Sequence, residues 1–242
     1  MVLLVQKYGG SSLTDLSKLE YIAKKIKTYV QSGYQVVVVL SAMQGETDRL
    51  IELSKYMNQN TLARESDALL ATGEQITTSM MAMALGRVGV KAKSLNAQQA
   101  GIYCDGKYSR AAITHIDEKS ILSLVAHGVV PVITGFQGVC EDGSVATLGR
   151  GGSDVTAVAV AAAIEADECQ IFVDVHGVYT SDPKIVERAR LIHSIPIDIM
   201  CGAAVLGAKV IQKRAVFCAQ KYRVPVRICS TYREGPGTMI DM

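Results

Sequence analysis

The chain has 242 residues, of which 49% are hydrophobic and 20% are charged, with 21 glycines and only 5 prolines. This composition is typical of a folded globular protein of one large domain or two small ones, and it excludes an intrinsically disordered chain. The 25 basic and 23 acidic side chains give a formal net charge of +2. Such a balance predicts neither a nucleic-acid partner nor binding to an anionic membrane surface.

The sequence lacks the signals of secretion, membrane insertion and structural zinc. Its N-terminal apolar run has four residues, too few for a signal peptide, and its longest apolar stretch lies around residues 157–164, far below the ~20 residues of a spanning helix. The six cysteines lie at least eleven positions apart, and the four histidines are isolated. We therefore expect reduced thiols, a cytoplasmic protein and no metal held by protein ligands alone.

Strand and helix patterns alternate along the chain. Apolar runs at residues 2–5 and 36–40 are typical of parallel strands covered on both faces, and the spacing of apolar residues from Leu16 to Val30 predicts a helix between them. Asp142-Gly143 predicts a tight hairpin. The alternation predicts an α/β sandwich with a mainly parallel central sheet. Further strands are expected at residues 90–95, 129–134, 170–174 and 224–230, and further helices at 74–88, 118–127, 154–166 and 208–222.

The first glycine-rich turn, residues 7–12, follows the first predicted strand and reads Lys-Tyr-Gly-Gly-Ser-Ser. Gly9 and Gly10 would let backbone N–H groups approach an anion, a helix N-terminus would add partial positive charge, and Lys7 would add a full one. The alternative is a plain turn. Neither a Walker-type loop nor the protein-kinase motifs occur in the sequence.

The second glycine-rich turn, residues 147–154, reads Thr-Leu-Gly-Arg-Gly-Gly-Ser-Asp and precedes an alanine-rich helix. Three glycines beside Arg150 would form an open backbone nest with a guanidinium that matches a carboxylate. The alternative makes Ser153 or Asp154 a simple N-cap. An N-cap does not require the Gly-Arg-Gly-Gly sequence before it, so we favour a ligand site.

Three more positions could act in a site or only in the fold. Glu74 lies near a helix start, where an acidic side chain is favourable without any ligand. Residues 172–183 follow a strand, where α/β proteins bind ligands, although a polar turn explains them too. Lys209 is expected to open the helix at 208–222, a place that disfavours a cation unless an anion lies opposite.

These motifs stand in the order seen in aspartokinases, and the chain resembles this group within the amino acid kinase superfamily. The resemblance covers nearly the whole chain, and residues 147–154 are its most specific part. It implies a three-layer αβα sandwich, with an aspartate-binding lobe at about residues 1–150 and an ATP-binding lobe at about 151–242. The matching segments are residues 7–12, 41–43, 72–75, 135–138, 147–154, 177–183, 207–210 and 235–238.

The resemblance also implies a reaction and its residues. Mg·ATP would phosphorylate the side-chain carboxylate of L-aspartate, giving 4-phospho-L-aspartate, the first step toward lysine, threonine and methionine. The implied catalytic residues are Lys7, Asp154 and Lys209. The implied ATP-binding residues are Lys7, Gly9, Gly10, Ser41, Val173, Asp174, Tyr179, Asp182, Lys184, Lys209 and Val210. The implied aspartate-binding residues are Thr47, Glu74, Arg150, Gly151, Gly152 and Ser153.

The chain departs from the family at its end. Family chains normally continue into ACT domains that bind lysine or threonine, and this chain stops at Met242. We therefore expect no ACT domains, no inhibition of this chain by lysine or threonine, and either a homo-oligomer or a complex with a regulatory chain. Two alternatives stay open: a related kinase with another substrate, such as acetylglutamate, glutamate or a nucleoside monophosphate, and a non-catalytic subunit or sensor with the same fold.

Overall fold

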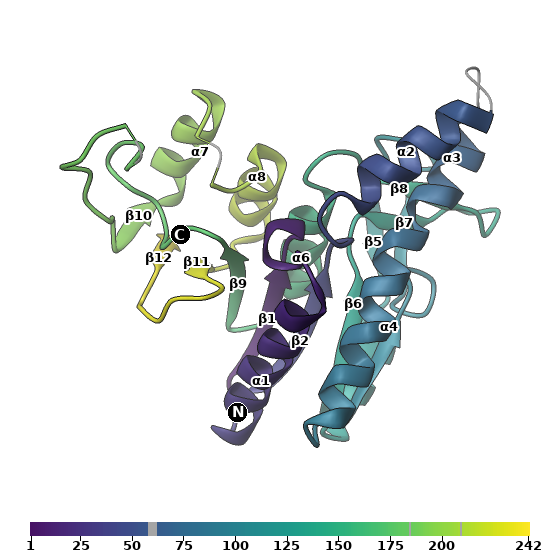
Figure 1. The fold of residues 1–242 in the computed structure, drawn as a ribbon, viewed down its shortest axis with the longest axis horizontal. Helices are drawn as coiled ribbons and strands as arrows, with labels where there is room; N and C mark the ends of the chain where they lie inside the picture. The colour runs from purple at the N-terminus through teal and green to yellow at the C-terminus, as the bar shows by residue number, and fades with distance from the viewer. Residues whose placement is uncertain (58–61, 184, 209) are drawn as a thin grey trace.

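The structure, a computed structural model, describes residues 1–57, 62–183, 185–208 and 210–242. Its main sheet, in these ranges, has eight strands in the order β10-β12-β11-β9-β1-β2-β6-β3, and all neighbours are parallel except β11 and β12 (Figure 1). The predicted, mainly parallel sheet is therefore confirmed. The strand bounds are β1 Leu3–Tyr8, β2 Gln35–Leu40, β3 Ala92–Leu95, β6 Val130–Thr134, β9 Glu168–Val173, β10 Ser194–Pro196, β11 Val226–Ser230 and β12 Thr238–Asp241.

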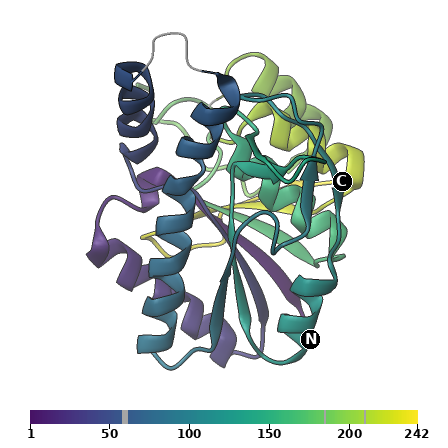
Figure 2. The ribbon, with the colours of Figure 1, turned by 90° about the vertical axis from the view of Figure 1, so that its right-hand side faces the viewer.

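Helices cover both faces of this sheet, which confirms the three-layer sandwich (Figure 2). On one face lie α1 (Leu16–Gln31) and α4 (Thr72–Arg87), and on the other lie α5 (Lys119–Ala126), α6 (Gly152–Ala163), α7 (Ile197–Val205) and α8 (Lys213–Tyr222). A helix pair, α2 (Glu46–Met57) and α3 (Ala63–Leu70), follows the carboxyl end of β2. None of the helices in the described ranges is long and apolar enough to cross a membrane.

A second sheet of short strands stands beside the first, with the order β5-β4-β7-β8. Its hairpin of β7 (Gln137–Val139) and β8 (Val145–Thr147) is the one that Asp142-Gly143 predicts, and Gly143 has a φ of +81° in its turn. The other pair, β4 (Ile102–Cys104) and β5 (Ile113–Ile116), was not predicted. Strands of three or four residues are too short to show a clear alternation of apolar and polar side chains.

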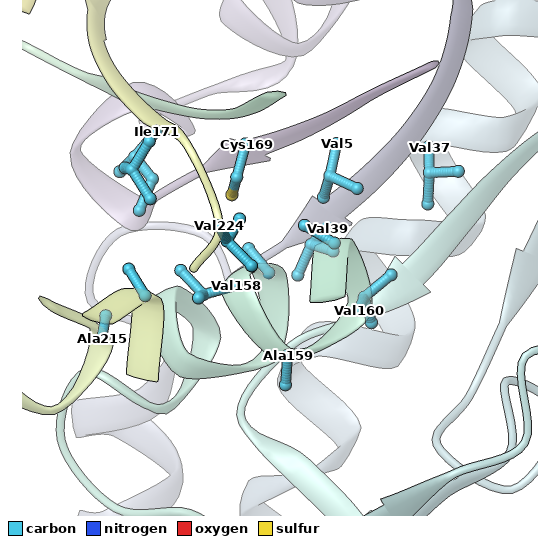
Figure 3. Close-up of a cluster of buried hydrophobic side chains, with 14 of the residues drawn as sticks. Val5, Val37, Val39, Val158, Ala159, Val160, Cys169, Ile171, Ala215 and Val224 are labelled. Atoms are coloured by element: carbon cyan, nitrogen blue, oxygen red, sulfur yellow. The ribbon is translucent and has the colours of Figure 1, made fainter. Parts of the chain in front are cut away.

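Helix α6 is buried almost all round, because it lies between the main sheet, β5 and α8. Its alanines let the helix come close to these neighbours, while Val158 and Val160 pack in the core with Val5 and Val37 of the sheet (Figure 3). A helix that is apolar all round from Ala157 to Ala163 is typical of a buried position. This packing fixes the N-terminus of α6 beside the carboxyl end of β1.

Helix α1 begins at Leu16, as predicted, but its N-terminus lies farther from the first glycine-rich turn than expected. The turn after β1 forms a short 3-10 helix, η1 (Gly10–Ser12), and α1 begins only after Asp15, whose side chain accepts the Lys18 N–H at 3.0 Å. The N-terminus of α1 therefore does not adjoin the two glycines. In α6 the N-cap is Gly151 with a φ of +74° and no side-chain cap, so the simple N-cap interpretation of Ser153 or Asp154 is wrong.

The helix predicted at 208–222 begins only at Lys213, because the backbone of Gln212 is extended, with ψ at 132°. Lys209 itself lies outside the described residues. The division into lobes near residue 150 stays a prediction, since β1 and β2 pair in one continuous sheet with β9.

Candidate active site

A cavity of about 570 Å³ lies at the carboxyl ends of β1 and β2. Strand β1 has β2 on one side and β9 on the other, and ligand sites of parallel sheets form where the connections diverge in this way. The cavity brings together predicted residues from β1, the segment after β2, α2, α4 and the start of α6. They are Lys7, Ser41, Thr47, Glu74, Arg150, Gly151, Gly152, Ser153 and Asp154.

Lys7 and Asp154 form a buried ion pair in this cavity. The Lys7 Nζ atom lies 2.6 Å from Oδ1 of Asp154, and the two side chains are only 10% and 9% exposed. The other oxygen of Asp154 accepts the Gln212 N–H at 3.4 Å. Because a central strand and a buried helix carry the two partners, the Lys7 amine is held in one place beside the partial positive charge of the α6 N-terminus.

Two glycines are needed for the backbone to pass this pair closely. A Cβ atom at Gly9 would lie 2.8 Å from the Lys7 Nζ atom. Gly151 has a φ of +74°, and a Cβ atom there would lie 2.2 Å from Cγ of Gln212. Any other residue at 151 would be strained by its backbone angle and would collide with Gln212.

Glu74 presents a buried carboxylate that is only half satisfied. It lies in the first turn of α4 and is 2% exposed. Its Oε1 atom accepts the Ala42 N–H at 3.0 Å, whereas Oε2 has no hydrogen-bond partner among the described residues. Burial outweighs this hydrogen bond and raises the pKa of Glu74 to about 7. An unpartnered buried oxygen in a cavity is a candidate for binding a ligand's donor group.

This raised pKa predicts how stability depends on pH. In the unfolded chain Glu74 titrates near its ordinary value of 4.5, so between pH 4.5 and about 7 the folded chain binds more protons. Its contribution to the free energy of unfolding therefore falls over this range, by up to about 3 kcal/mol.

We expect Glu74→Gln to remove this loss of stability with rising pH, because the glutamine side chain does not titrate. Urea unfolding should show the variant gaining stability over the unsubstituted chain as the pH rises from about 5 to about 7.5. An equal stability difference between the two proteins at both pH values would rule out Glu74 as the titrating group.

Arg150 leaves its guanidinium available. The side chain is exposed and forms no ion pair with any residue in the described part of the chain. Its backbone is held from the other side of the site, because Nη2 of Arg214 in α8 donates to the carbonyl oxygen of Arg150 at 2.8 Å. The loop is thus fixed while its cationic end is free to bind a carboxylate.

The predicted nucleotide residues Val173, Asp174, Tyr179, Asp182 and Val210, at the end of β9 and beyond it, do not line this cavity. Val173 and Val210 are partly buried against the core around α6, Asp174 and Asp182 are exposed, and Tyr179 forms an isolated bridge with Leu191. Lys184 and Lys209 lie outside the described residues. A role of this segment in nucleotide binding stays a prediction.

Sequence reasoning missed Asp67, which also lines the cavity. This aspartate of α3 is fully buried and accepts hydrogen bonds from Ser109 and Thr147. A signal was present: Asp67 and Leu70 follow the spacing of one helix face, and a carboxylate on an otherwise buried face needs partners.

Together the fold and the cavity define an α/β protein whose site, at the switch point of a parallel sheet, carries both a cationic and an anionic binding group. Residues 2–230 match the model of the amino acid kinase family. The chain belongs to this family.

Individual relatives are similar over the full length of the chain. It is 48% identical over 242 residues to the aspartate kinase of Pseudomonas putida and 44% identical over 241 residues to aspartokinase 2 of Bacillus subtilis, covering 100% of this chain and 59% of each relative. The crystal structure of aspartate kinase from Synechocystis is 40% identical with a TM-score of 0.89, covering 99% of this chain and 39% of that one.

A further structure, E. coli aspartokinase III in complex with aspartate and ADP, is 25% identical with a TM-score of 0.83, covering 98% of this chain and 64% of that one. The chain thus spans about three fifths of the length of the curated relatives that it matches.

Proposed function

We propose that this chain is the catalytic part of an aspartate kinase, which transfers the γ-phosphate of ATP to the side-chain carboxylate of L-aspartate and yields 4-phospho-L-aspartate and ADP. The observation that carries the proposal is one cavity lined by the Lys7–Asp154 pair, the unpartnered carboxylate of Glu74 and the free guanidinium of Arg150. The likeness to a kinase solved with aspartate and ADP supports the same reaction. In this proposal the reaction opens the route to lysine, threonine and methionine.

The acceptor is an amino acid with two carboxylates, and the cavity offers a group for each end. Arg150 binds the α-carboxylate through two parallel N–H donors, and Glu74 binds the ammonium through Oε2. Thr47 and Ser153 supply hydroxyl groups, and Gly151 and Gly152 supply backbone N–H groups. The side-chain carboxylate is then directed toward Lys7.

In the transfer step an oxygen of this carboxylate bonds to the γ-phosphorus, and the bond from phosphorus to the β,γ-bridging oxygen breaks, so that ADP leaves. Lys7 and the N–H groups of Gly9 and Gly10 stabilise charge on the moving phosphoryl group. Asp154 keeps the Lys7 amine in place. Ser41, the segment after β9, Lys184, Lys209 and Val210 hold the nucleotide in this proposal.

Magnesium fits this site as a companion of the nucleotide. The described residues contain no group of three or more His, Cys, Asp or Glu side chains that could hold a metal ion. Mg²⁺ in kinases needs only one or two carboxylates, because the substrate phosphates and water supply its other ligands. Asp154, a buried carboxylate in the first turn of α6, could take this part, and the ion would neutralise phosphate charge.

A hydroxylamine trap for acyl phosphates tests the proposed reaction. With Mg·ATP, the purified chain is expected to form a hydroxamate from L-aspartate and none from L-glutamate or N-acetyl-L-glutamate, while UMP releases no ADP. Reactions without ATP or without Mg²⁺ serve as controls. Hydroxamate from acetylglutamate would instead assign the chain to a related kinase.

Absence of ADP release with every acceptor would favour the non-catalytic sensor. A homo-oligomer or a complex with a regulatory chain stays a prediction that follows from the resemblance, and a cytoplasmic location stays a prediction from the N-terminal sequence and the cysteine spacing.

A further inference from the structure

We propose that Asp67 is a positioning residue that holds the acceptor-binding loop, residues 147–153, and so sets the affinity for aspartate without taking part in the transfer step. This inference rests on the proposed function. Asp67 has no place among the residues that the sequence motifs or the resemblance assign to the site.

The contacts of Asp67 are unusually complete for a buried carboxylate. Its Oδ2 atom accepts the backbone N–H groups of Ser109 and Thr147, both at 2.7 Å. Its Oδ1 atom accepts the hydroxyl groups of Thr147 at 2.9 Å and Ser109 at 3.3 Å. Four donors surround one side chain that is 0% exposed. Burial of an ionised carboxylate is costly without such donors, so this arrangement fixes the place of both partners.

Both partners lie at the base of the acceptor loop. Thr147 ends β8 and directly precedes the glycine-rich turn, and its carbonyl oxygen accepts the Ala111 N–H at 2.9 Å. Ser109 has a φ of +67°, which is unfavourable for a residue with a side chain. Its carbonyl oxygen would lie 2.8 Å from a Cβ atom at Gly149. Asp67 therefore holds a strained turn directly against the turn that carries Arg150.

The part of the loop that follows Thr147 is held by Arg214. The guanidinium of Arg214 in α8 donates to the carbonyl oxygens of Leu148 and Arg150. Asp67 thus binds N–H groups at the base of the loop, and Arg214 binds carbonyl groups at its centre. The loop backbone is ordered before the substrate arrives, which lowers the entropy that binding must otherwise remove.

The main test compares Asp67→Ala with Asp67→Asn. Alanine removes every contact, and we expect KM for aspartate to rise at least about 10-fold, with KM for ATP and kcat changing less than about 3-fold. Asparagine has the same shape, and its amide can accept both N–H groups while it donates to both hydroxyls, which rotate freely. We therefore expect Asp67→Asn to restore most of the affinity for aspartate.

Asp105 offers a matched control. Its carboxylate also accepts backbone N–H groups, from Lys107 and Ala112, but it is exposed and does not line the cavity. We expect Asp105→Asn to leave both KM values unchanged. Equal rises of both KM values in Asp67→Ala, or a fall of kcat alone, would overturn the positioning role.

A double-variant cycle with Arg150→Ala shows whether Asp67 acts through the loop. If it does, Asp67→Ala should raise KM for aspartate much less when Arg150 is already absent. Additive effects would mean a separate structural role and would contradict the proposal. Should Asp67→Ala fail to fold, Thr147→Val removes only the hydroxyl contact and is expected to raise the same KM in the same cycle.

A readout without substrate separates this proposal from the proposed function. Hydrogen exchange of the backbone amides at residues 147–152 should quicken in the Asp67→Ala or Thr147→Val chain, while exchange in α1 stays unchanged. If the unsubstituted chain proves inactive on aspartate, the proposed function fails, and hydrogen exchange still decides whether Asp67 holds the loop. Unchanged exchange at 147–152 would overturn the inference by itself.

Discussion

Replacement of Lys7 by alanine is expected to lower kcat for phosphoryl transfer by at least about 100-fold, and Asp154→Ala is expected to do the same. Lys7 is the cation that faces the transferring group in the proposed mechanism, and Asp154 holds its amine at 2.6 Å. Initial rates at saturating ATP and aspartate measure the effect. A folded variant with near-normal turnover would remove that residue from the catalytic assignment.

Loss of turnover must be separated from loss of the fold. Each single substitution leaves its partner as a buried charge without a counter-ion, which typically costs about 3–5 kcal/mol. The double variant Lys7→Ala/Asp154→Ala removes both charges, so its free energy of unfolding should recover in part. Its kcat should stay as low as that of Lys7→Ala. Recovery of activity together with stability would show that the pair acts only in the fold.

Arg150→Ala and Glu74→Gln are expected to raise KM for aspartate at least about 30-fold, because truncation of one partner of a buried charge pair typically costs ~2–5 kcal/mol. KM for ATP should change little, since both side chains face the acceptor in the proposed mechanism. Steady-state kinetics with each substrate varied in turn measure KM for aspartate and KM for ATP separately. The exposed Arg150 has no ion pair with the described residues to lose, so its removal should leave stability unchanged.

Arg87→Ala provides the control for Arg150→Ala. Arg87 is also exposed and lies at the end of α4, outside the cavity, where it pairs with Glu20 at 2.7 Å. Removal of the Arg87 side chain should change neither KM for aspartate nor KM for ATP. If Arg150→Ala raised both KM values equally, the loop would be damaged in general. The same result for Glu74→Gln would leave Glu74 only as a favourable acidic residue at the start of α4.

Much of the fold was predictable because its signals are local. The apolar run at residues 36–40 forms most of the buried strand β2, and the residues from Leu16 to Val30 form α1, as their spacing predicts. Asp142-Gly143 marked the hairpin of β7 and β8. Each signal depends on the preferences of neighbouring residues for strand, helix or turn, which act before any tertiary contact forms.

Helix ends and the small sheet were harder to predict for a physical reason. The N-cap of α6 is Gly151, whose positive φ and close approach to Gln212 involve a residue from a distant part of the chain. The strands β4 and β5 are held by each other and by β7, and too few residues form them for a pattern to appear.

By itself the sequence determined six strands of the main sheet (β1, β2, β3, β6, β9 and β11), the hairpin of β7 and β8, most helices, both glycine-rich turns and the family to which the chain belongs. Only the tertiary structure decided which side chains meet. Lys7 of β1 forms an ion pair with Asp154 of α6, and Asp67 accepts hydrogen bonds from Ser109 and Thr147, which lie 42 and 80 positions further along the chain. Such contacts depend on how the helices pack on the sheet, and a single sequence carries no local signal for them. Packing also buries Glu74 with one oxygen that has no partner among the described residues. For this reason Glu74, which the sequence marks only as a favourable residue at a helix start, is a candidate binding group.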